Sequence, residues 1–175
     1  CCGTTPEHLR QTVEAVRDLT PATRTPSYEP SVSSIYSPVA LHQDLSVLMI
    51  GERTNANGSK AFRDALLAGD IDTTVKMANE QIKEGSHVLD LCVDYVGRDG
   101  AIDMDLIAGR FATQASVPLV LDSTEPPVLE AGLAHVGGRA ILNSANLEDG
   151  ELPGSRFDRV MSLAREHGAA VICLL

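Results

Sequence analysis

The side chains best suited to chemistry in this chain are carboxylates and amides that follow short apolar runs. They are Glu52, Asn55, Asp94, Asp122 and Asn143, and each lies at or just past the end of such a run. Carboxylates accept hydrogen bonds, and amides both donate and accept them. No cluster of Lys or Arg accompanies these residues. The pattern therefore favours a polar ligand held by hydrogen bonds over a polyphosphate.

The elements that must position these side chains are short strands alternating with helices. Amphipathic stretches of helical length separate the apolar runs, which is the βαβα pattern of a parallel sheet with crossover helices. We predict an α/β fold comprising the first five strands of a partial (β/α)8 TIM barrel, in which the carboxyl ends of the strands face a common site. The runs are 48–55, 87–94, 118–124, 140–146 and 169–175.

Apolar residues at helical spacing predict the helices of this fold. Asp103 is the expected N-cap of one of them, because Asp accepts hydrogen bonds from the free amides of a first turn. The helices are predicted over 58–69, 71–84, 103–115, 125–136 and 154–167.

The segment before the first barrel strand has a different composition. Thr5 and Pro6 predict the start of a short amphipathic helix within residues 1–20. Residues 21–46 are rich in Pro and Ser, which is typical of an extended linker. The barrel is expected to begin at about Val47.

Composition excludes several classes of function. The chain has 175 residues, of which 43% are hydrophobic, enough for one core. Its net charge of −10 argues against nucleic acid or an anionic membrane as a partner. No apolar run is long enough to span a membrane. Cys92 and Cys173 fall in predicted buried strands, where a reduced Cys behaves as a small hydrophobe. We expect a reduced, cytoplasmic protein.

The two ends of the chain suggest a fragment. It opens on Cys1 and Cys2 and closes on an apolar strand. A complete barrel of this type needs roughly 250 residues, and residues 47–175 supply about half of that number. We therefore expect a barrel domain that is truncated here.

Several motifs resemble one family. GERTNANGSKAF at 51–62, LDLCVDYVGRDG at 89–100, LDSTEPPVLEAGL at 121–133 and ILNSAN at 141–146 are similar to the pterin-binding domain of the cobalamin-dependent methionine synthase family. CCGTTPEHL at 1–9 is similar to the end of the homocysteine-binding domain that precedes it in that family. The resemblance implies a homocysteine-domain remnant at 1–20, a linker at 21–46 and a truncated pterin-binding domain at 47–175.

The resemblance also implies an activity and its cofactors. Members of the family move a methyl group from methyl-tetrahydrofolate to cobalamin and then to homocysteine, and a separate domain absent from this chain holds the cobalamin. Cys1 and Cys2 are similar to ligands of the zinc ion that activates homocysteine. A third ligand would come from outside the chain, so the zinc site here is incomplete. The fragment alone is expected to be inactive.

Asp122 and Asn143 are the clearest candidates for pterin recognition. A carboxylate can accept two hydrogen bonds from the paired donors on one edge of a pterin ring, and such charge-assisted bonds are strong. The resemblance gives this role to Asp122, whose alternative role is to cap the helix near Pro126. The Asn143 amide could bind the ring's polar atoms or form a turn. We assign the turn to Asn146.

Glu52, Asn55 and Asp90 complete the predicted pterin site. The resemblance places Glu52 and Asn55 in a loop against the ring, although Glu52 could instead pair with Arg53 at the surface. Asp90 alternates with two leucines, so it faces the opposite side of its strand and could point into the barrel. A buried carboxylate is costly unless it is satisfied, so Asp90 contacts either the ligand or a backbone group. Asp94 is the weakest of the candidates.

Other functions remain open at this point. A dihydropteroate synthase and a corrinoid protein methyltransferase share pterin recognition, a non-catalytic binding fragment needs no chemistry, and a sugar-phosphate barrel enzyme needs a phosphate loop. Methyl transfer from a pterin requires a proton on the methylated nitrogen. The sequence identifies no single donor, and we predict a network around Asn55, Asp122 and Asn143.

Overall fold

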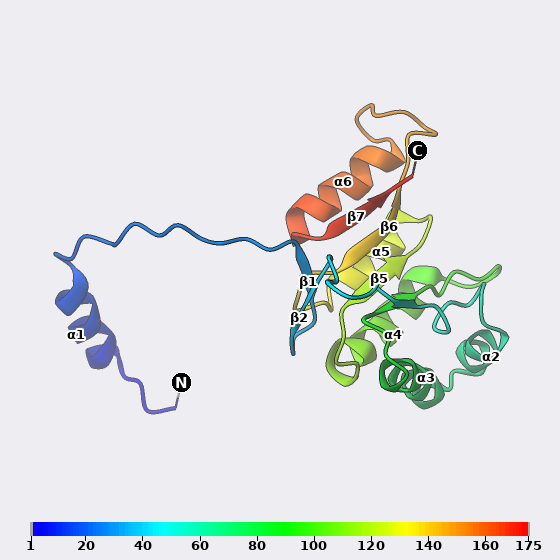
Figure 1. Ribbon diagram of the computed structural model, residues 1–175, viewed down its shortest axis with the longest axis horizontal. Helices are drawn as coiled ribbons and strands as arrows, with labels where there is room; N and C mark the ends of the chain where they lie inside the picture. Colours follow the sequence, from blue (N-terminus) through cyan, green and yellow to red (C-terminus); the bar gives the residue numbers. More distant parts are fainter. Residues whose placement is uncertain (1, 175) are drawn as a thin grey trace.

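The computed structural model describes residues 2–174 and contains a parallel five-stranded sheet. The strands lie side by side in chain order, and Figure 1 shows the last three of them, β5, β6 and β7. This arrangement confirms the predicted α/β fold with a partial barrel. Short βαβ connections place each new strand beside the last. The strands are β3 (Ile50–Gly51), β4 (Val88–Leu91), β5 (Leu119–Asp122), β6 (Ile141–Ala145) and β7 (Ala170–Cys173).

The predicted helices are all present, and four of those after the linker begin at a side-chain cap. Ser59, Asp70, Asp99 and Ser155 each accept a hydrogen bond from a backbone amide of the first turn. The cap predicted at Asp103 is wrong, because the helix begins three residues earlier, after Asp99. The helices are α2 (Lys60–Ala68), α3 (Ile71–Lys83), α4 (Gly100–Gln114), α5 (Pro126–Leu133) and α6 (Arg156–His167).

Alternation along the strands separates two faces of the sheet. Leu89, Leu91 and Leu121 point to the outer face, where they pack with Phe62, Phe111 and other helix residues in the main core. The residues between them point inward. Val88, Val120 and Ile141 form a second, smaller buried cluster on that inner face. The same inner face carries the polar residues of the strand ends, because side chains repeat with a period of two.

An antiparallel hairpin covers the amino-terminal end of the inner face. It consists of β1 (Ser31–Ser33) and β2 (Pro38–Ala40), and Val32 is fully buried in the inner cluster. The prediction of an extended linker over 21–46 is therefore wrong for residues 31–40. The physical reason is a single apolar side chain, since Val32 fills the apolar end of the barrel interior that Val88, Val120 and Ile141 leave uncovered.

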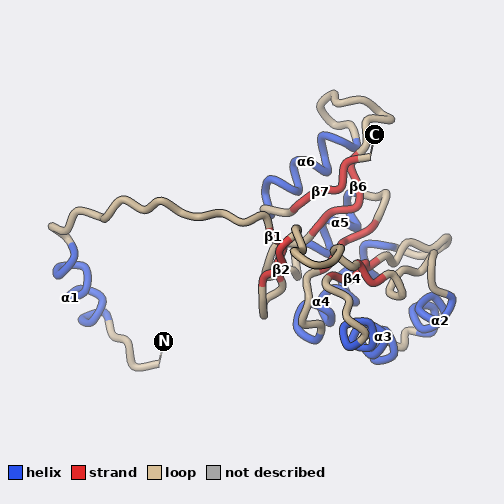
Figure 2. The backbone as a smooth tube through the Cα atoms, in the orientation of Figure 1, coloured by secondary structure: helices blue, strands red, loops and turns tan. Residues whose placement is uncertain are grey.

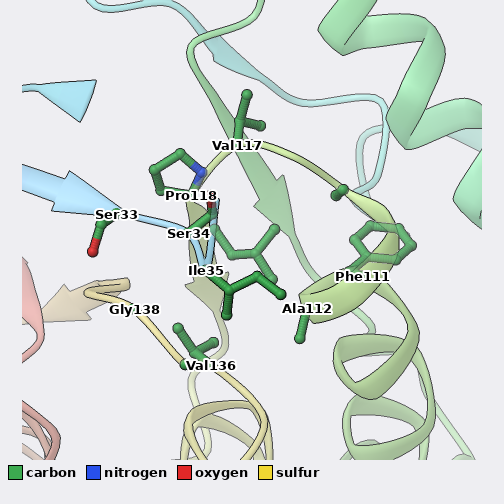
Figure 3. Close-up of a pocket in the computed structure, with 12 residues that line it drawn as sticks. Ser33, Ser34, Ile35, Phe111, Ala112, Val117, Pro118, Val136 and Gly138 are labelled. Atoms are coloured by element: carbon green, nitrogen blue, oxygen red, sulfur yellow. The ribbon is translucent and has the colours of Figure 1, made fainter. Parts of the chain in front are cut away.

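The hairpin is also held by polar contacts. Ser33 and Arg139 exchange two backbone hydrogen bonds of 3.0 Å, and the Ser34 hydroxyl donates to the Ser116 carbonyl at 2.8 Å. A small cavity lies under the hairpin, between the end of α4 and the turn before β6 (Figure 3). Figure 3 shows Ile35 between Ala112 and Val136 at this junction.

We expect Gly138→Ala to loosen the hairpin. A Cβ at Gly138 would lie 2.2 Å from the backbone oxygen of Ser33, which cannot move without breaking the Ser33–Arg139 pairing. Overpacking of this kind costs about 1–3 kcal/mol. Hydrogen exchange of residues 31–40, followed by mass spectrometry, should become faster. Gly109→Ala in α4 is the control, because its Cβ would meet only the His135 ring, at 3.2 Å and outside the hairpin. Equal exchange in both variants would contradict the prediction.

Residues 2–27 stand apart from the sheet, and the first tie to it is the Tyr28 hydroxyl, which accepts a hydrogen bond from Arg139 at 2.7 Å. Helix α1 (Pro6–Val16) begins after Thr5, which caps it as predicted. Residues 20–30 form no helix or strand, and Figure 2 shows them as an extended loop leading to β1. The apolar residues Leu9, Val13 and Val16 of α1 are exposed. Among the residues described, no helix is long and apolar enough to cross a membrane.

Candidate pterin-binding site

Four neighbouring strand ends place their side chains in one row. Asp122 pairs with Asn143 across β5 and β6, and an isolated parallel bridge joins Asn55 to Cys92. Leu91 pairs with Leu121, so Cys92, the next residue, lies beside Asp122. Partners in a parallel sheet point to the same face. The row Asn55, Cys92, Asp122 and Asn143 therefore lines the carboxyl end of the inner face.

Three residues of this row, Asn55, Asp122 and Asn143, line a cavity of about 270 Å³. All five residues predicted for the pterin site line it, so the structure brings the whole predicted set together. Its lining is polar at the strand ends and apolar deeper in the barrel. The lining residues are Ile50, Glu52, Asn55, Asp90, Val120, Asp122, Asn143 and Ile172.

Asn55 links the two central carboxylates. Its amide nitrogen donates to one oxygen of Asp90 at 2.8 Å and to one oxygen of Asp122 at 3.0 Å. Its amide oxygen accepts from the backbone N–H groups of Asn57 and Gly58, at 2.9 and 3.1 Å. The turn after β3 thus fixes which way the buried amide faces, and the amide in turn holds both carboxyl groups at the cavity.

Asp90 is a buried carboxyl group with a free oxygen. It is 5% exposed, and its Oδ1 has no hydrogen-bond partner in the structure. Burial raises the pKa of Asp90 to about 6, and the negative charges of Asp122 and Glu52 add to the effect, while the bond from Asn55 opposes it. The alternative that Asp90 satisfies a backbone group is not observed. Asp90 lines the cavity, and its Oδ1 is a buried oxygen that has no hydrogen-bond partner in the structure.

Asp122 is half-buried at the end of β5. Burial raises its pKa, as does the nearby charge of Asp94, whereas hydrogen bonds from Asn55 and Cys92 lower it. The alternative in which Asp122 caps α5 is wrong, because the N-cap is Glu125, which makes no side-chain cap bond. One of its oxygens accepts from Asn55, so the group is oriented before any ligand arrives.

The loop that follows Asp122 is held by Asp94, the weakest of the sequence candidates, and by Ser123 and Arg156, which sequence reasoning did not single out. The Ser123 hydroxyl donates to Asp94 at 2.8 Å, and the Thr124 amide donates to it at 3.3 Å. The Arg156 guanidinium, at the start of α6, donates to the backbone oxygens of Thr124 and Ser123 at 2.9 and 3.2 Å. Asp94 therefore supports the loop beside the site.

Two further predictions at the site can be compared with the structure. Arg53 forms an ion pair with Glu84, so the predicted alternative of a Glu52–Arg53 pair is wrong, and exposed Glu52 lines the cavity instead. Asn146 accepts a bond of 3.4 Å from the backbone N–H of Glu148, which confirms its turn role.

The burial of one of the two strand cysteines differs from the prediction. Cys92 is buried as predicted, but Cys173 is exposed, because β7 is the last strand of the sheet described and lacks a neighbour on one side. Cys2 is exposed near α1, and Cys1 lies outside the described residues. Within residues 2–174, no three His, Cys, Asp or Glu side chains are grouped as a metal site. Zinc at Cys1 and Cys2 stays a prediction.

A parallel sheet whose strand ends gather carboxylates and amides around one cavity defines a class of ligand-binding barrels. The family of pterin-binding enzymes matches residues 51–175 of this chain, from β3 to the end of the sheet. Because the match spans most of the chain, the chain belongs to the pterin-binding enzymes.

Two similar proteins are methionine synthases from mycobacteria. The Mycobacterium tuberculosis (strain ATCC 25618 / H37Rv) protein is 56% identical over 174 residues, and the Mycobacterium leprae (strain TN) protein is 55% identical over 179 residues. Each alignment covers 99% of this chain but only 15% of the relative. The chain therefore corresponds to a small part of those proteins' length.

A solved structure supports the assignment of the fold. Xanthomonas albilineans dihydropteroate synthase superposes with a TM-score of 0.52 at 17% identity, over 85% of this chain and 49% of that chain. Likeness at this identity concerns the fold alone. It agrees with a partial barrel of the pterin-binding type.

Proposed function

We propose that this chain holds the pterin ring of methyl-tetrahydrofolate within a methionine synthase. The observation that carries the proposal is the cavity at the strand ends, where Asn55 joins Asp90 and Asp122 and Asn143 stands alongside. The mycobacterial relatives support the choice of this activity within the family. Residues 47–175 act as part of the pterin-binding domain.

Each side chain has a proposed role at the ring. Asp122 accepts from the paired donors on one edge of the pterin, and the Asn143 amide binds a neighbouring polar atom. Asp90 offers its unpartnered oxygen, and Glu52 lies at the rim of the same cavity. Asn55 fixes both aspartates, so binding does not require the carboxyl groups to reorganise.

The hydrogen-bonded group of Asp90, Asn55 and Asp122 is suited to supplying a proton to the methylated nitrogen of the pterin. Protonation makes the pterin a better leaving group for methyl transfer. Asp90 has a pKa of about 6, so it exchanges its proton near neutral pH. Asn55 connects Asp90 to Asp122 and therefore couples their titrations. We assign proton supply to this network rather than to one residue.

The remaining steps are proposed for the whole protein in its cytoplasmic setting. Cobalamin, held by a separate domain, accepts the methyl group before homocysteine does. Residues 1–20 belong to the homocysteine-binding domain, where Cys1 and Cys2 would contribute thiolates to zinc, and residues 21–46 connect the two domains. These assignments rest on the resemblance of the sequence motifs to the methionine synthase family, since the zinc donors of this chain alone do not complete a site.

A ligand titration tests the proposal. We expect the full-length protein to bind 5-methyl-tetrahydrofolate with a measurable heat in isothermal titration calorimetry. A dihydropteroate synthase would instead bind a pyrophosphorylated dihydropterin, and among residues 2–174 no Lys or Arg lines the cavity to hold the pyrophosphate. Preference for the pyrophosphorylated ligand, or no binding of either, would refute the proposal.

A further inference from the structure

We propose that Gln81 is a positioning residue of the pterin site, whose buried side-chain amide holds the turn 52–55 and so fixes how Glu52 and Asn55 face the ligand. The inference rests on the proposed function and gives a role in it to a helix residue that is not among those lining the cavity. It is carried by three hydrogen bonds that run from α3 through the turn to β4.

Gln81 is a polar residue at a buried position of α3. It is 2% exposed, in a helix that packs against β4. Val75 and Ala78 are buried in the same helix and belong to the main core. An apolar side chain would cover the sheet equally well at this position, whereas a buried amide costs free energy unless its donor and acceptor are paired. Packing alone therefore does not account for Gln81.

Both polar atoms of the Gln81 amide are paired with the turn. Its Oε1 accepts from the backbone N–H of Arg53 at 2.7 Å, and its Nε2 donates to the Thr54 hydroxyl at 3.4 Å. Because a backbone N–H can only donate, the atom facing Arg53 must be the oxygen, which determines how the amide is oriented. Thr54 is fully buried, and its hydroxyl donates to the backbone oxygen of Asp90 at 2.5 Å. The series of bonds thus ends at a residue of the cavity.

These bonds hold the centre of a turn that has a ligand position at each end. Arg53 and Thr54 separate Glu52 from Asn55, and the two outer residues both line the cavity. The Asn55 N–H donates to the Glu52 carbonyl at 3.1 Å, which closes the turn. Because Gln81 ties the middle of the turn to α3, both outer side chains project from a fixed backbone.

Gly51 leaves the space that the Gln81 amide occupies. A Cβ at Gly51, the last residue of β3, would lie 2.8 Å from Gln81 Oε1 and 2.7 Å from Ser86 Oγ. A larger side chain at position 51 would push the amide away from the N–H of Arg53. The close approach of strand and amide supports a role for Gln81 at the turn in addition to its place in the helix.

Gln81→Met tests the inference, because it removes both bonds and keeps a side chain of similar length. We expect the affinity of the full-length protein for 5-methyl-tetrahydrofolate to fall roughly 10-fold in titration calorimetry, which corresponds to the loss of about one hydrogen bond. Hydrogen exchange of residues 52–55 without ligand should become faster. Gln81→Glu keeps an oxygen for the Arg53 N–H and should bind within about 3-fold of the unsubstituted protein.

A second pair of variants interrupts the bonds at Thr54. Thr54→Val keeps the volume but removes the hydroxyl, and it should lower the affinity roughly 5-fold, whereas Thr54→Ser keeps the hydroxyl and should stay within about 2-fold. This pair decides the question even where Gln81→Met does not fold.

The control weakens the packing of α3 without touching the turn. Val75→Ala serves, because Val75 is buried in the main core on the same helix. It should lower thermal stability while the affinity for 5-methyl-tetrahydrofolate and the exchange of residues 52–55 stay unchanged.

Three outcomes would overturn the inference. They are an unchanged affinity in both Gln81→Met and Thr54→Val, an equal loss in Gln81→Met and Gln81→Glu, and an equal loss in Val75→Ala. The last of these would show that packing of the helix alone is responsible. Failure of the unsubstituted protein to bind 5-methyl-tetrahydrofolate would instead refute the proposed function. Exchange of residues 52–55, measured without ligand, still tests the role of Gln81 at the turn in that case, so the two failures are distinguishable.

Discussion

Asp122→Asn should weaken binding of 5-methyl-tetrahydrofolate by about 1.5–3 kcal/mol, or roughly 10- to 150-fold. The substitution keeps the shape of the side chain but replaces one acceptor oxygen by an N–H donor, which would face a donor on the pterin edge. The neighbouring Asn55 amide also loses its charged acceptor at 3.0 Å, and it faces another donor if the new NH2 group turns toward it. Titration calorimetry of the full-length protein at neutral pH measures the effect.

The matching control removes a carboxylate outside the site. Asp105→Asn removes a carboxylate that is 67% exposed and lies 2.7 Å from His135 Nε2. Contacts between exposed side chains contribute little to stability, and Asp105 is not among the residues that line the cavity. Folate affinity should be unchanged in Asp105→Asn. An equal loss in the two variants, or none in Asp122→Asn, would remove Asp122 from the site.

Asp90→Asn should stabilise the fold at neutral pH while it weakens the ligand site. Burial holds the pKa of Asp90 at about 6, above its ordinary value of 3.8. An unfolded chain releases this proton near pH 4, whereas the folded chain retains it until about pH 6. Folding stability attributable to Asp90 is therefore present at low pH and is lost as the pH rises from about 4 to about 6.

The size of this loss follows from the same two values. The difference of about two pKa units corresponds to about 3 kcal/mol at neutral pH. An amide at position 90 does not ionise, and its oxygen can still accept from Asn55, so the variant avoids the loss. Thermal unfolding between about pH 4 and pH 7 should show the variant gaining stability over the unsubstituted protein as the pH rises.

A gain that appears only below pH 4 would have the wrong sign and would contradict the assigned protonation of Asp90. A constant difference at every pH would show instead that the substitution acts through packing. Leu142→Ala provides a reference for that pattern, because Leu142 is fully buried on the outer face and carries no charge. Its cost should be independent of pH.

The grouping of the strand-end residues and the inward direction of Asp90 can be predicted from local sequence patterns. Asn55, Asp122 and Asn143 were predicted to lie together because each follows an apolar run, and parallel strands place their carboxyl ends at the same edge. Asp90 was expected to point inward because it alternates with leucines. Neither inference required knowledge of distant contacts, and both agree with the structure.

The features that sequence reasoning missed depend on contacts between distant segments. Cys92 looks like a core residue until the bridge to Asn55 and the register with β5 place it in the polar row. Arg156 lies 33 residues from Ser123, and composition gives no sign of that bond. Residues 31–40 look like a linker by their Pro and Ser content, but one valine packs into the barrel and makes them part of the fold.

The β1–β2 hairpin also limits how a ligand can reach the inner face of the sheet. Val32 is fully buried against Val120 and covers the amino-terminal end of the inner face. We expect a ligand of the cavity to enter and leave at the opposite, carboxyl end of the strands, where Asp122 and Asn143 lie.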